Sequence, residues 1–424
     1  MPSTADPNGG RVAFTHPGFV LFQVARFLIV AAVEMQAVAV GWQVYEITKR
    51  PLDLGYVGLA QFLPAILLFP ISGHASDHFE RRHVLSACYA GYGVCFALLL
   101  LLSMRAPSIE LIYVVLILIG IVRSFNSTAS RAILPQLVPQ EHFPNAVAWN
   151  ASIFQAATIL GPSFGGIVYA AFHGPETVYA IAMVTAIGAT ISSFRIRPEV
   201  KPRPREPMSL KTVFAGLHYI WNKKLILGAI SLDLFAVLLG GAVALLPVYS
   251  REILHTGPWG LGLLRTAPGV GAAVMAVFLA HWPMRGKSGR TLLWAVAGFG
   301  VFTIIFGISR SLTLSLIALF LLGASDMISV IIRATLTQLA TPDAMRGRVT
   351  AVDMIFIGTS NEFGQFESGV TAQWFGTVPA VILGGVGTLV VIALWAWWFP
   401  ELRNAGALHT IVSGAETTTT ADPA

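Results

Sequence analysis

The chain has 424 residues, of which 55% are hydrophobic and 11% are charged, and its formal net charge is +6. Soluble domains carry about 25% charged residues, and so few charges could not cover the surface of a soluble fold of this size. The composition therefore excludes a water-soluble protein and predicts a polytopic membrane protein. The positive balance does not indicate nucleic-acid binding, because the basic residues lie mostly in short segments between long apolar runs.

Long apolar runs follow one another along almost the whole chain. A membrane-crossing helix needs about 20 predominantly apolar residues, and lipid offers no hydrogen-bond partner to a backbone that is not helical. By that measure we expect twelve α-helical spans, at residues 19–46, 54–74, 84–104, 109–131, 146–171, 176–194, 225–249, 260–281, 291–309, 312–334, 350–374 and 378–399.

Lysine and arginine are unequally shared between the two sets of connecting segments. An even number of spans places both termini on one side of the membrane, and seventeen basic residues lie on that side against five on the other. Cytoplasmic loops are enriched in lysine and arginine. We therefore expect a multi-pass protein of the plasma (inner) membrane with both termini in the cytoplasm.

The longest connection separates the first six spans from the last six. Its first part is rich in proline and charge and is expected to be extended. In its second part, apolar residues recur at helical spacing beside three lysines, which predicts an amphipathic helix on the inner membrane surface or, alternatively, an extension of the seventh span. The predicted domains are a six-helix bundle at 1–194, a cytoplasmic linker at 195–224, a second six-helix bundle at 225–400 and a disordered cytoplasmic tail at 401–424.

Two short stretches recur at about half the chain length. Arg131–Leu137 returns 202 residues later as Arg333–Leu339 with five of seven residues identical. A weaker echo relates Pro51–Gly55 to Pro258–Gly262. Self-similarity at a fixed offset indicates repeated architecture. The predicted fold class is therefore an all-α membrane protein with twelve helices in two pseudo-symmetric six-helix bundles.

Charged residues are absent from spans three, six, nine and twelve. They occur in spans one, four, seven, eight, ten and eleven. A charge at the bilayer centre costs at least ~2.5 kcal/mol on insertion scales, so such groups mark substrate or ion pathways. The charge-free spans are accordingly expected to face lipid. The candidates for proton or substrate coupling are Glu34, Asp233, Arg123, Arg26, Asp326, Glu362 and Glu367.

Each of these candidates has a structural alternative. Glu34 and Asp233 lie 199 residues apart, close to the repeat offset, and either could form a buried pair with an arginine that fixes helix packing. Arg123 has no charged counterpart 202 residues on, so it could hold an anionic or phenolic substrate or lower the pKa of a carboxylate during the transport cycle. The acids of the eleventh span could line a cavity or pair with Arg265 or Arg333.

Six plus six spans joined by a basic linker resemble the major facilitator superfamily of transporters, and local motifs strengthen the resemblance. The loop after the second span is similar to that superfamily's signature in Gly73, Asp77, Arg81 and Arg82, although Glu80 stands where glycine is common. Residues 131–150 and 341–349 resemble the drug and siderophore export branch that includes the enterobactin exporter.

The resemblance implies a cytoplasmic gate formed by Gly73, Asp77, Arg81, Arg82, Arg131 and Arg333. There Asp77 would pair with Arg131 or with the positive N-terminus of the eleventh span; the alternative is that the basic residues only set the topology. The fifth span is also similar to the antiporter motif of exporters, in Gly161, Pro162, Gly165 and Gly166. Small residues permit close helix approach, and we expect this motif to pack against the eighth span.

The predicted function is that of a secondary active transporter, with proton-coupled efflux of small amphipathic, drug- or siderophore-like molecules by alternating access. The alternatives are a metabolite uptake symporter of the same fold and a non-transporting membrane receptor or scaffold. The sequence has no phosphate-cradling GxxxxGK[ST] loop and no HExxH or CxxC metal motif. We therefore expect no enzyme activity, cofactor or metal, a proton gradient as energy source, membrane lipids and a small-molecule substrate as partners, no nucleic acid, and a monomer.

Overall fold

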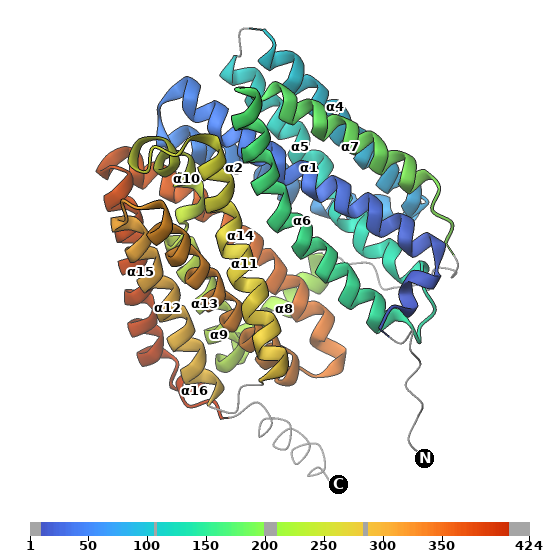
Figure 1. The fold of residues 1–424 in the computed structure, drawn as a ribbon. Coiled ribbons are helices and arrows are strands. Elements are labelled where there is room, and N and C mark those ends of the chain that lie inside the picture. Colours follow the sequence, from blue (N-terminus) through green and yellow to red (C-terminus); the bar gives the residue numbers. More distant parts are fainter. Residues whose placement is uncertain (1–9, 106–107, 199–209, 283–286, 407–424) are drawn as a thin grey trace. The chain divides into compact units, whose positions relative to one another are not determined.

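The computed structural model describes residues 10–105, 108–198, 210–282 and 287–406 (Figure 1). Within these residues the chain is helical, and no strand occurs among them. The helices of the first half are α1 (Pro17–Thr48), α2 (Pro51–Leu67), α3 (Phe69–His78), α4 (Arg81–Ser103), α5 (Ile109–Ile133), α6 (Phe143–Phe172) and α7 (Glu176–Phe194). The short 3-10 segments η1 (Val12–Thr15) and η2 (Leu134–Gln136) precede α1 and follow α5.

The second half repeats this pattern of long helices. It contains α8 (Leu210–Asn222), α9 (Lys224–Leu239), η3 (Ala242–Leu245), α10 (Leu246–Val248), the π-helical turn η4 (Tyr249–Ile253), α11 (Gly257–His281), α12 (Ser288–Ile308), α13 (Leu312–Leu339), α14 (Asp343–Phe375), α15 (Thr377–Trp398) and α16 (Pro400–Arg403). The predicted all-α polytopic membrane fold is confirmed.

Ten segments of the described chain are long and apolar enough to cross a membrane, and they coincide with ten of the twelve predicted spans. The predicted span at 54–74 is divided between α2 and α3, which meet at Leu68. The predicted span at 350–374 is α14, whose 33 residues reach about 50 Å at 1.5 Å per residue. Its acids and polar residues make α14 less apolar than the other long helices.

Prolines explain the division of the second span. Pro64 lies inside α2, and a second proline stands at the start of α3. Proline lacks the N–H that an internal helical turn requires and its ring clashes with the preceding turn. The backbone N–H of Leu68 still donates to the carbonyl of Pro64 at 3.0 Å, so backbone hydrogen bonding continues up to the break between the two helices.

The chain forms two compact units. The first contains Met1–Ile47, Ala60–Met208 and Gly257–Thr266, and the second contains Thr48–Leu59, Ser209–Thr256 and Ala267–Ala424. The units therefore follow the two halves of the sequence, except that the first turns of α2 group with the second half and the first part of α11 groups with the first half. The predicted boundaries at 194 and 224 stay predictions. The disordered tail predicted at 401–424 is wrong at its start, because Pro400–Arg403 form the helix α16, and residues 407–424 lie outside the described residues.

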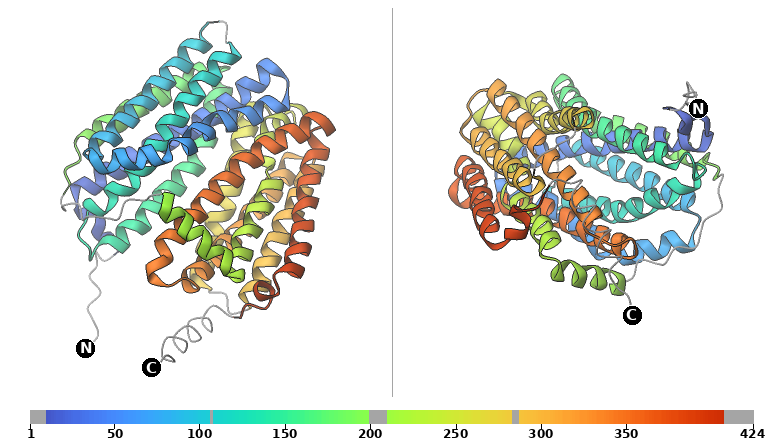
Figure 2. Two further views of the ribbon diagram at one scale, coloured as in Figure 1. Left: turned by 180° about the vertical axis from the view of Figure 1, so that it is seen from behind. Right: turned by 90° about the horizontal axis from the view of Figure 1, so that it is seen from below.

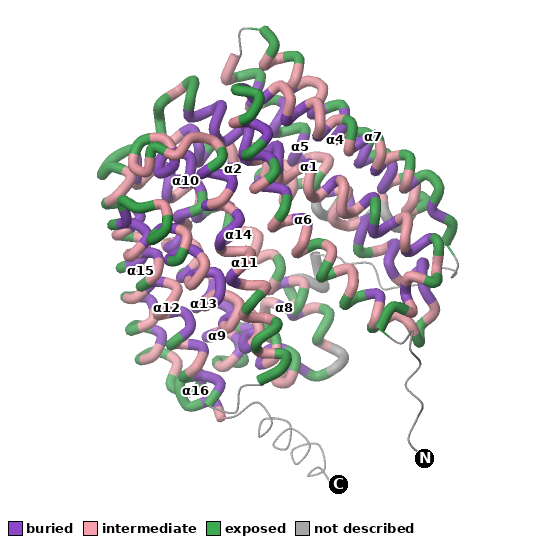
Figure 3. The backbone as a smooth tube through the Cα atoms, viewed as in Figure 1, coloured by how far each residue is buried: buried purple, intermediate pink, exposed green. Residues whose placement is uncertain are grey.

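Equivalent helices pack in equivalent ways within the two units. In the first unit α4 packs along α7 and α5, and in the second α12 packs along α15 and α13 (Figure 1; Figure 2). Helices α4, α7, α12 and α15 correspond to the predicted spans without charge, and they expose large apolar side chains such as Val184 of α7 and Trp294 of α12. Figure 3 shows exposed positions along these helices. Such faces suit lipid, as the distribution of charges predicts.

The helix predicted before the seventh span is α8, and it is separate from α9. The backbone breaks at Lys223, which has φ −110° and ψ 92°. Helix α8 packs on the first part of α14 (Figure 2), where Ile220 is buried and the hydroxyl of Tyr219 donates to the carbonyl of Ala340 at 3.2 Å. Burial raises the pKa of Tyr219. The alternative of a continuous extension of the seventh span is wrong, whereas the membrane-surface position stays a prediction.

The seventh span is a broken helix. Helix α9 ends at Leu239, and η3, α10 and η4 continue the span to Ile253. Two consecutive glycines and Pro247 disfavour a regular helix here. The hydroxyl of Ser368 on α14 donates to the carbonyl of Gly241 at 2.9 Å. Irregular backbone at membrane depth is tolerated only where protein or water satisfies it, and α14 supplies that partner.

Candidate functional site

The loop between α3 and α4 carries the motif expected at the gate. Arg81 begins α4, and its Nη1 donates to the carbonyl of Ala132 near the end of α5 at 3.0 Å. Cations favour the carbonyl-rich ends of helices, so Arg81 ties α4 to α5. Gly73 lies within α3, where an added Cβ would meet no atom within 4 Å. The backbone of Asp77 is part of α3, but its side chain lies outside the described residues.

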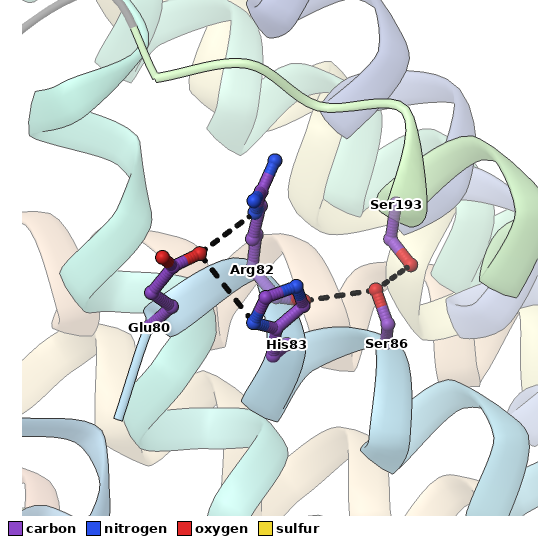
Figure 4. Close-up of polar contacts among 5 residues, drawn as sticks. All are labelled: Glu80, Arg82, His83, Ser86 and Ser193. Atoms are coloured by element: carbon purple, nitrogen blue, oxygen red, sulfur yellow. Dashed lines mark hydrogen bonds and ion pairs between the residues drawn. The ribbon is translucent and has the colours of Figure 1, made fainter. Parts of the chain in front are cut away.

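Glu80, the position at which the motif departs from the superfamily pattern, organises the turn. Its Oε2 accepts from Nε of Arg82 at 2.9 Å and lies 3.4 Å from Nδ1 of His83 (Figure 4). One turn further on, the hydroxyls of Ser86 and Ser193 are 2.7 Å apart and join α4 to α7. Arg82 is therefore held in its own loop, and Arg131 is an exposed side chain near the end of α5. The gate itself stays a prediction.

The antiporter-like motif of α6 packs on two helices of the first unit. A Cβ added at Gly166 would lie 2.6 Å from the carbonyl oxygen of Pro258 and 2.9 Å from the Cα of Gly262 on α11. Ser163 and Thr266 bring their hydroxyls to 2.7 Å. The predicted packing against the eighth span, α11, is therefore observed, with Pro162 contributing its carbonyl oxygen to the same contact with Gly262.

The opposite face of the motif packs on α1 beside Glu34. A Cβ added at Gly161 would lie 2.6 Å from the Cβ of Glu34, and one added at Gly165 would lie 2.8 Å from the Cα of Met35. The sequence signalled four small residues in α6 but not that two of them serve α1. Glu34, an intramembrane acid, therefore lies on α1 where α1 packs closely against α6.

A second glycine contact in the second unit mirrors the first. A Cβ added at Gly369 of α14 would lie 3.1 Å from the Cα of Gly55, and one added at Gly55 would lie 3.1 Å from the Cα of Phe366. Gly55 and Gly262 are the final glycines of the weaker sequence echo, and both stand where a helix start crosses a long helix closely. The echo therefore records a repeated backbone contact.

Arg333 joins three helices of the second unit. Its Nη1 donates to Oδ1 of Asp353 at 2.5 Å, and its Nη2 lies 3.3 Å from Oδ2 of Asp233. Arg333 is 3% exposed and Asp233 is 7% exposed. Asp326, two turns earlier on α13, is within electrostatic range of both Asp233 and Arg333. We call Asp233, Asp326, Arg333 and Asp353 the Arg333 cluster.

The cluster decides between alternatives that the sequence left open. Asp233 does pair with an arginine, and Asp353 is the acid of the eleventh span that pairs with Arg333. Sequence analysis missed the joining of α9, α13 and α14 at one point. The cluster contains three carboxylates and one guanidinium, so it holds more acid than base. Arg333 is buried in the bundle, and a role for it at the gate stays a prediction.

Glu362 and Glu367 lie further along α14, away from Arg333 in sequence. Glu362 is buried and accepts from Nε2 of Gln365 at 3.3 Å. Its Oε2 would be 3.5 Å from a Cβ added at Gly58 of α2, so it lies at the glycine contact between α14 and α2. Glu367 accepts from the hydroxyl of Thr371 at 2.6 Å. Both acids therefore have local polar partners.

The two remaining arginine candidates lie in the first unit. Arg123 is an exposed side chain of α5, within electrostatic range of the buried Tyr92. Arg26 of α1 donates from Nη1 to the hydroxyl of Ser130 at 2.8 Å, and its guanidinium lies 5.2 Å from the ring centroid of Phe154. Across the described residues, no group of three or more histidine, cysteine, aspartate or glutamate side chains could hold a metal ion.

Comparisons with known proteins agree on one family. A family model described as Major Facilitator Superfamily matches residues 22–363. The chain is 27% identical over 412 residues to the enterobactin exporter EntS of Citrobacter koseri, covering 95% of this chain and 96% of that protein. It is 26% identical over 364 residues to the uncharacterized MFS-type transporter YfiS of Bacillus subtilis, covering 82% and 85%.

Solved structures share the fold. The crystal structure of a D-xylose-proton symporter matches with a TM-score of 0.71 at 14% sequence identity, covering 93% of this chain and 99% of that chain. A likeness at this identity carries the architecture alone, because one fold hosts many functions.

Proposed function

From the premise that this chain belongs to the Major Facilitator Superfamily, we propose that it is a secondary active exporter of small amphipathic molecules. It works by alternating access and is driven by the proton gradient. The chain is a multi-pass membrane transporter of that superfamily, and its resemblance to the siderophore and drug export branch is confirmed. The direction of transport, the coupling ion and the class of substrate are what we propose.

The relatives support export. The enterobactin exporters of Citrobacter koseri and Escherichia coli align with more than nine-tenths of this chain at 25% to 27% identity. Both relatives are named as exporters of enterobactin. The symporter structure shares 14% identity and gives no argument for uptake, so export is the function that the comparisons favour.

The Arg333 cluster is the observation that supports proton coupling. Intramembrane carboxylates are the usual proton carriers of transporters. Asp233 and Asp353 share the guanidinium of Arg333, whereas Asp326 forms no ion pair within the described part of the chain. A carboxylate in that position can gain and lose a proton while the Arg333 ion pairs hold the three helices together. We assign the coupling proton to Asp326.

The direction of transport is tested in everted membrane vesicles from cells that produce the protein. With enterobactin as the first probe and a panel of fluorescent amphipathic dyes beside it, an imposed gradient that is acidic inside should drive accumulation. A protonophore should abolish that accumulation. Accumulation only in right-side-out vesicles would show that the protein is an uptake transporter.

The same vesicles test the assignment to Asp326. Asp326→Asn cannot exchange a proton, so we expect gradient-driven accumulation to fall at least tenfold while exchange of substrate across the membrane without a gradient persists. Asp53→Asn is the matched control, because Asp53 lies at the start of α2 beside Arg50, 3.8 Å away, and outside the cluster. An Asp326→Asn variant with the accumulation of the wild type would rule out this carboxylate.

Two further expectations belong to the same proposal. Both termini lie in the cytoplasm, as the distribution of lysine and arginine predicts, and the loop with Gly73, Asp77, Arg81 and Arg82 closes the cytoplasmic side together with Arg131. We also expect a monomer that needs membrane lipid and a small-molecule substrate and no other partner.

A further inference from the structure

A second buried polar group lies in the first unit, apart from the Arg333 cluster. Gln23 and Arg26 are three residues apart on α1 and so share one face of that helix. Tyr89 on α4 is within electrostatic range of Arg26, and Ser130 on α5 and Phe154 on α6 contact its guanidinium. We call these five residues the Arg26 group. Four helices of one unit thus meet around a single guanidinium.

The Arg26 group carries positive charge without an acid. Within the described residues no carboxylate pairs with Arg26, and a second arginine, Arg131, is within electrostatic range of it. Arg333 in the other unit has two carboxylates of its own. Lipid does not solvate an arginine inside a membrane bundle, so its guanidinium faces protein partners, water or a counter-charge. Its hydrogen bond to Ser130 and its contact with Phe154 supply no negative charge.

Three polar atoms of the group lack hydrogen-bond partners among the described residues. They are Nε of Arg26, the hydroxyl of Tyr89 and Oε1 of Gln23, and all three are buried. Tyr89 is 0% exposed and Gln23 is 2% exposed, so bulk solvent does not reach them. Buried polar groups in native proteins are nearly always bonded, and each exception calls for a partner. Two of these atoms are donors to an anion, and the third accepts from a hydroxyl.

Two members of the group are partly exposed. Phe154, whose ring lies against the guanidinium, is 42% exposed, and Arg26 itself is only half-buried, whereas Tyr89 is fully buried. An apolar ring beside a cation suits a ligand that combines an anionic group with an aromatic or aliphatic body.

We propose that Arg26 and Tyr89 bind the oxyanion of the transported molecule, a carboxylate or a phenolate, and that the substrate is therefore an amphipathic organic anion. The Arg26 Nε–H and the Tyr89 O–H donate to the anion, and Gln23 accepts from a neighbouring hydroxyl. This inference rests on the proposed export function and names its substrate class. It assigns no role in proton coupling to these residues.

Binding is tested without transport, on purified protein in nanodiscs of neutral phosphatidylcholine. Salicylate is the probe, and salicylamide is its matched neutral analogue with the same ring and hydroxyl. We expect salicylate to raise the melting temperature of the wild type in a saturable way and salicylamide to have no such effect. Arg26→Gln and Tyr89→Phe should weaken the apparent affinity for salicylate at least tenfold.

A matched tyrosine separates binding from folding. The hydroxyl of Tyr179, also 0% exposed, donates to Oε1 of Gln43 at 2.8 Å, so Tyr179→Phe removes a made hydrogen bond and should lower the melting temperature with unchanged salicylate affinity. Tyr89→Phe removes an unpartnered hydroxyl and should keep or raise the melting temperature of the free protein. Its loss of affinity would then not reflect misfolding.

Three outcomes overturn the inference. The first is salicylate affinity that survives both Arg26→Gln and Tyr89→Phe, and the second is protection by salicylamide equal to that by salicylate. The third is an Arg26-dependent rise in melting temperature on adding phosphatidylglycerol to the nanodiscs with none from salicylate, which would assign the site to a lipid headgroup. Accumulation in vesicles tests the export function, and binding in nanodiscs tests the anion site. Either hypothesis can therefore be rejected without the other.

Discussion

Two arginines inside the membrane bundles show how much the partners of a residue decide. Arg333 is 3% exposed and lies between the carboxylates of Asp233 and Asp353. Arg26 has a hydroxyl and an aromatic ring instead of an acid. The charge of Arg333 is therefore balanced within the protein, whereas that of Arg26 remains available to an anion.

The Arg333 cluster should fail if its single base is removed. Arg333→Ala would leave the carboxylates of Asp233 and Asp353 buried without a cation, and breaking a buried pair in this way costs about 3–5 kcal/mol. We expect a large fall in melting temperature and in the amount of monodisperse protein recovered from membranes, measured by fluorescence-detected size exclusion.

Two comparisons make the Arg333 result specific. Arg403→Ala changes an exposed arginine of α16 and should leave the melting temperature close to that of the wild type. Adding Asp233→Asn and Asp353→Asn to Arg333→Ala should recover part of the lost stability, because the uncompensated charges disappear. An Arg333→Ala variant as stable as the wild type would show that the pairs do not hold α9, α13 and α14 together.

At the scale of helices, glycine contacts set how closely the long elements approach. Gly166 of α6 meets Gly262 of α11, and Gly369 of α14 meets Gly55 of α2. Each pair places two backbones in direct contact, which larger side chains would prevent. The glycines of α6 also allow α1 to pack closely against α6, and Glu34 lies on α1 at this contact.

A single methyl group should disturb this contact. Gly166→Ala places a Cβ 2.6 Å from the carbonyl oxygen of Pro258, and overpacking of this kind costs about 1–3 kcal/mol. We expect a lower melting temperature and a loss of most transport activity, measured in the same vesicles as export. The clash is with backbone, so the neighbouring side chains cannot relieve it by changing rotamer.

Gly347→Ala is the control for that substitution. It lies within α14, and an added Cβ there would meet no atom within 4 Å. Alanine is the better helix former by about 1 kcal/mol, so this variant should be as stable as the wild type or more stable. Equal behaviour of the Gly166 and Gly347 variants would contradict the importance of the α6–α11 contact.

At the scale of the whole molecule, the repeat of Arg131–Leu137 in Arg333–Leu339 no longer implies equal roles. Residues 134–136 form the 3-10 segment η2 with Pro135, whereas α13 continues unbroken to Leu339. Arg131 is an exposed side chain near the end of its helix, and Arg333 is buried one and a half turns before the end of α13. Both arginines therefore lie in the last part of their helices, but Arg131 is exposed and Arg333 is buried.

The gate is a property of the transport cycle and is tested at this scale. Asp77→Asn removes the charge that would hold the inner side closed, so we expect transport to fall at least tenfold. The amount of protein in the membrane should equal that of the wild type, measured by quantitative blotting of the vesicles used for transport. Unchanged transport by Asp77→Asn would remove the gate hypothesis and leave the basic residues with a role in topology only.

The helical membrane architecture, the placement of most spans and the family can all be predicted from the amino-acid sequence alone. The reason is that lipid imposes a length and an apolar composition on every span, and those are readable along one chain. The two exceptions, the divided α2–α3 and the acid-rich α14, have prolines and charges that the sequence displays. Small residues in α6 likewise predicted a close helix contact.

Which charged side chains meet depends on how the helices pack. Asp233, Arg333 and Asp353 are up to 120 residues apart in the sequence, and their pairing depends on which faces of α9, α13 and α14 turn toward one another. The burial of Tyr89 beside Arg26 depends in the same way on the packing of α1 and α4. The periodicity of a sequence shows which residues share one face of a helix. Which helix packs against that face depends on the tertiary structure and cannot be read from the helix's own sequence.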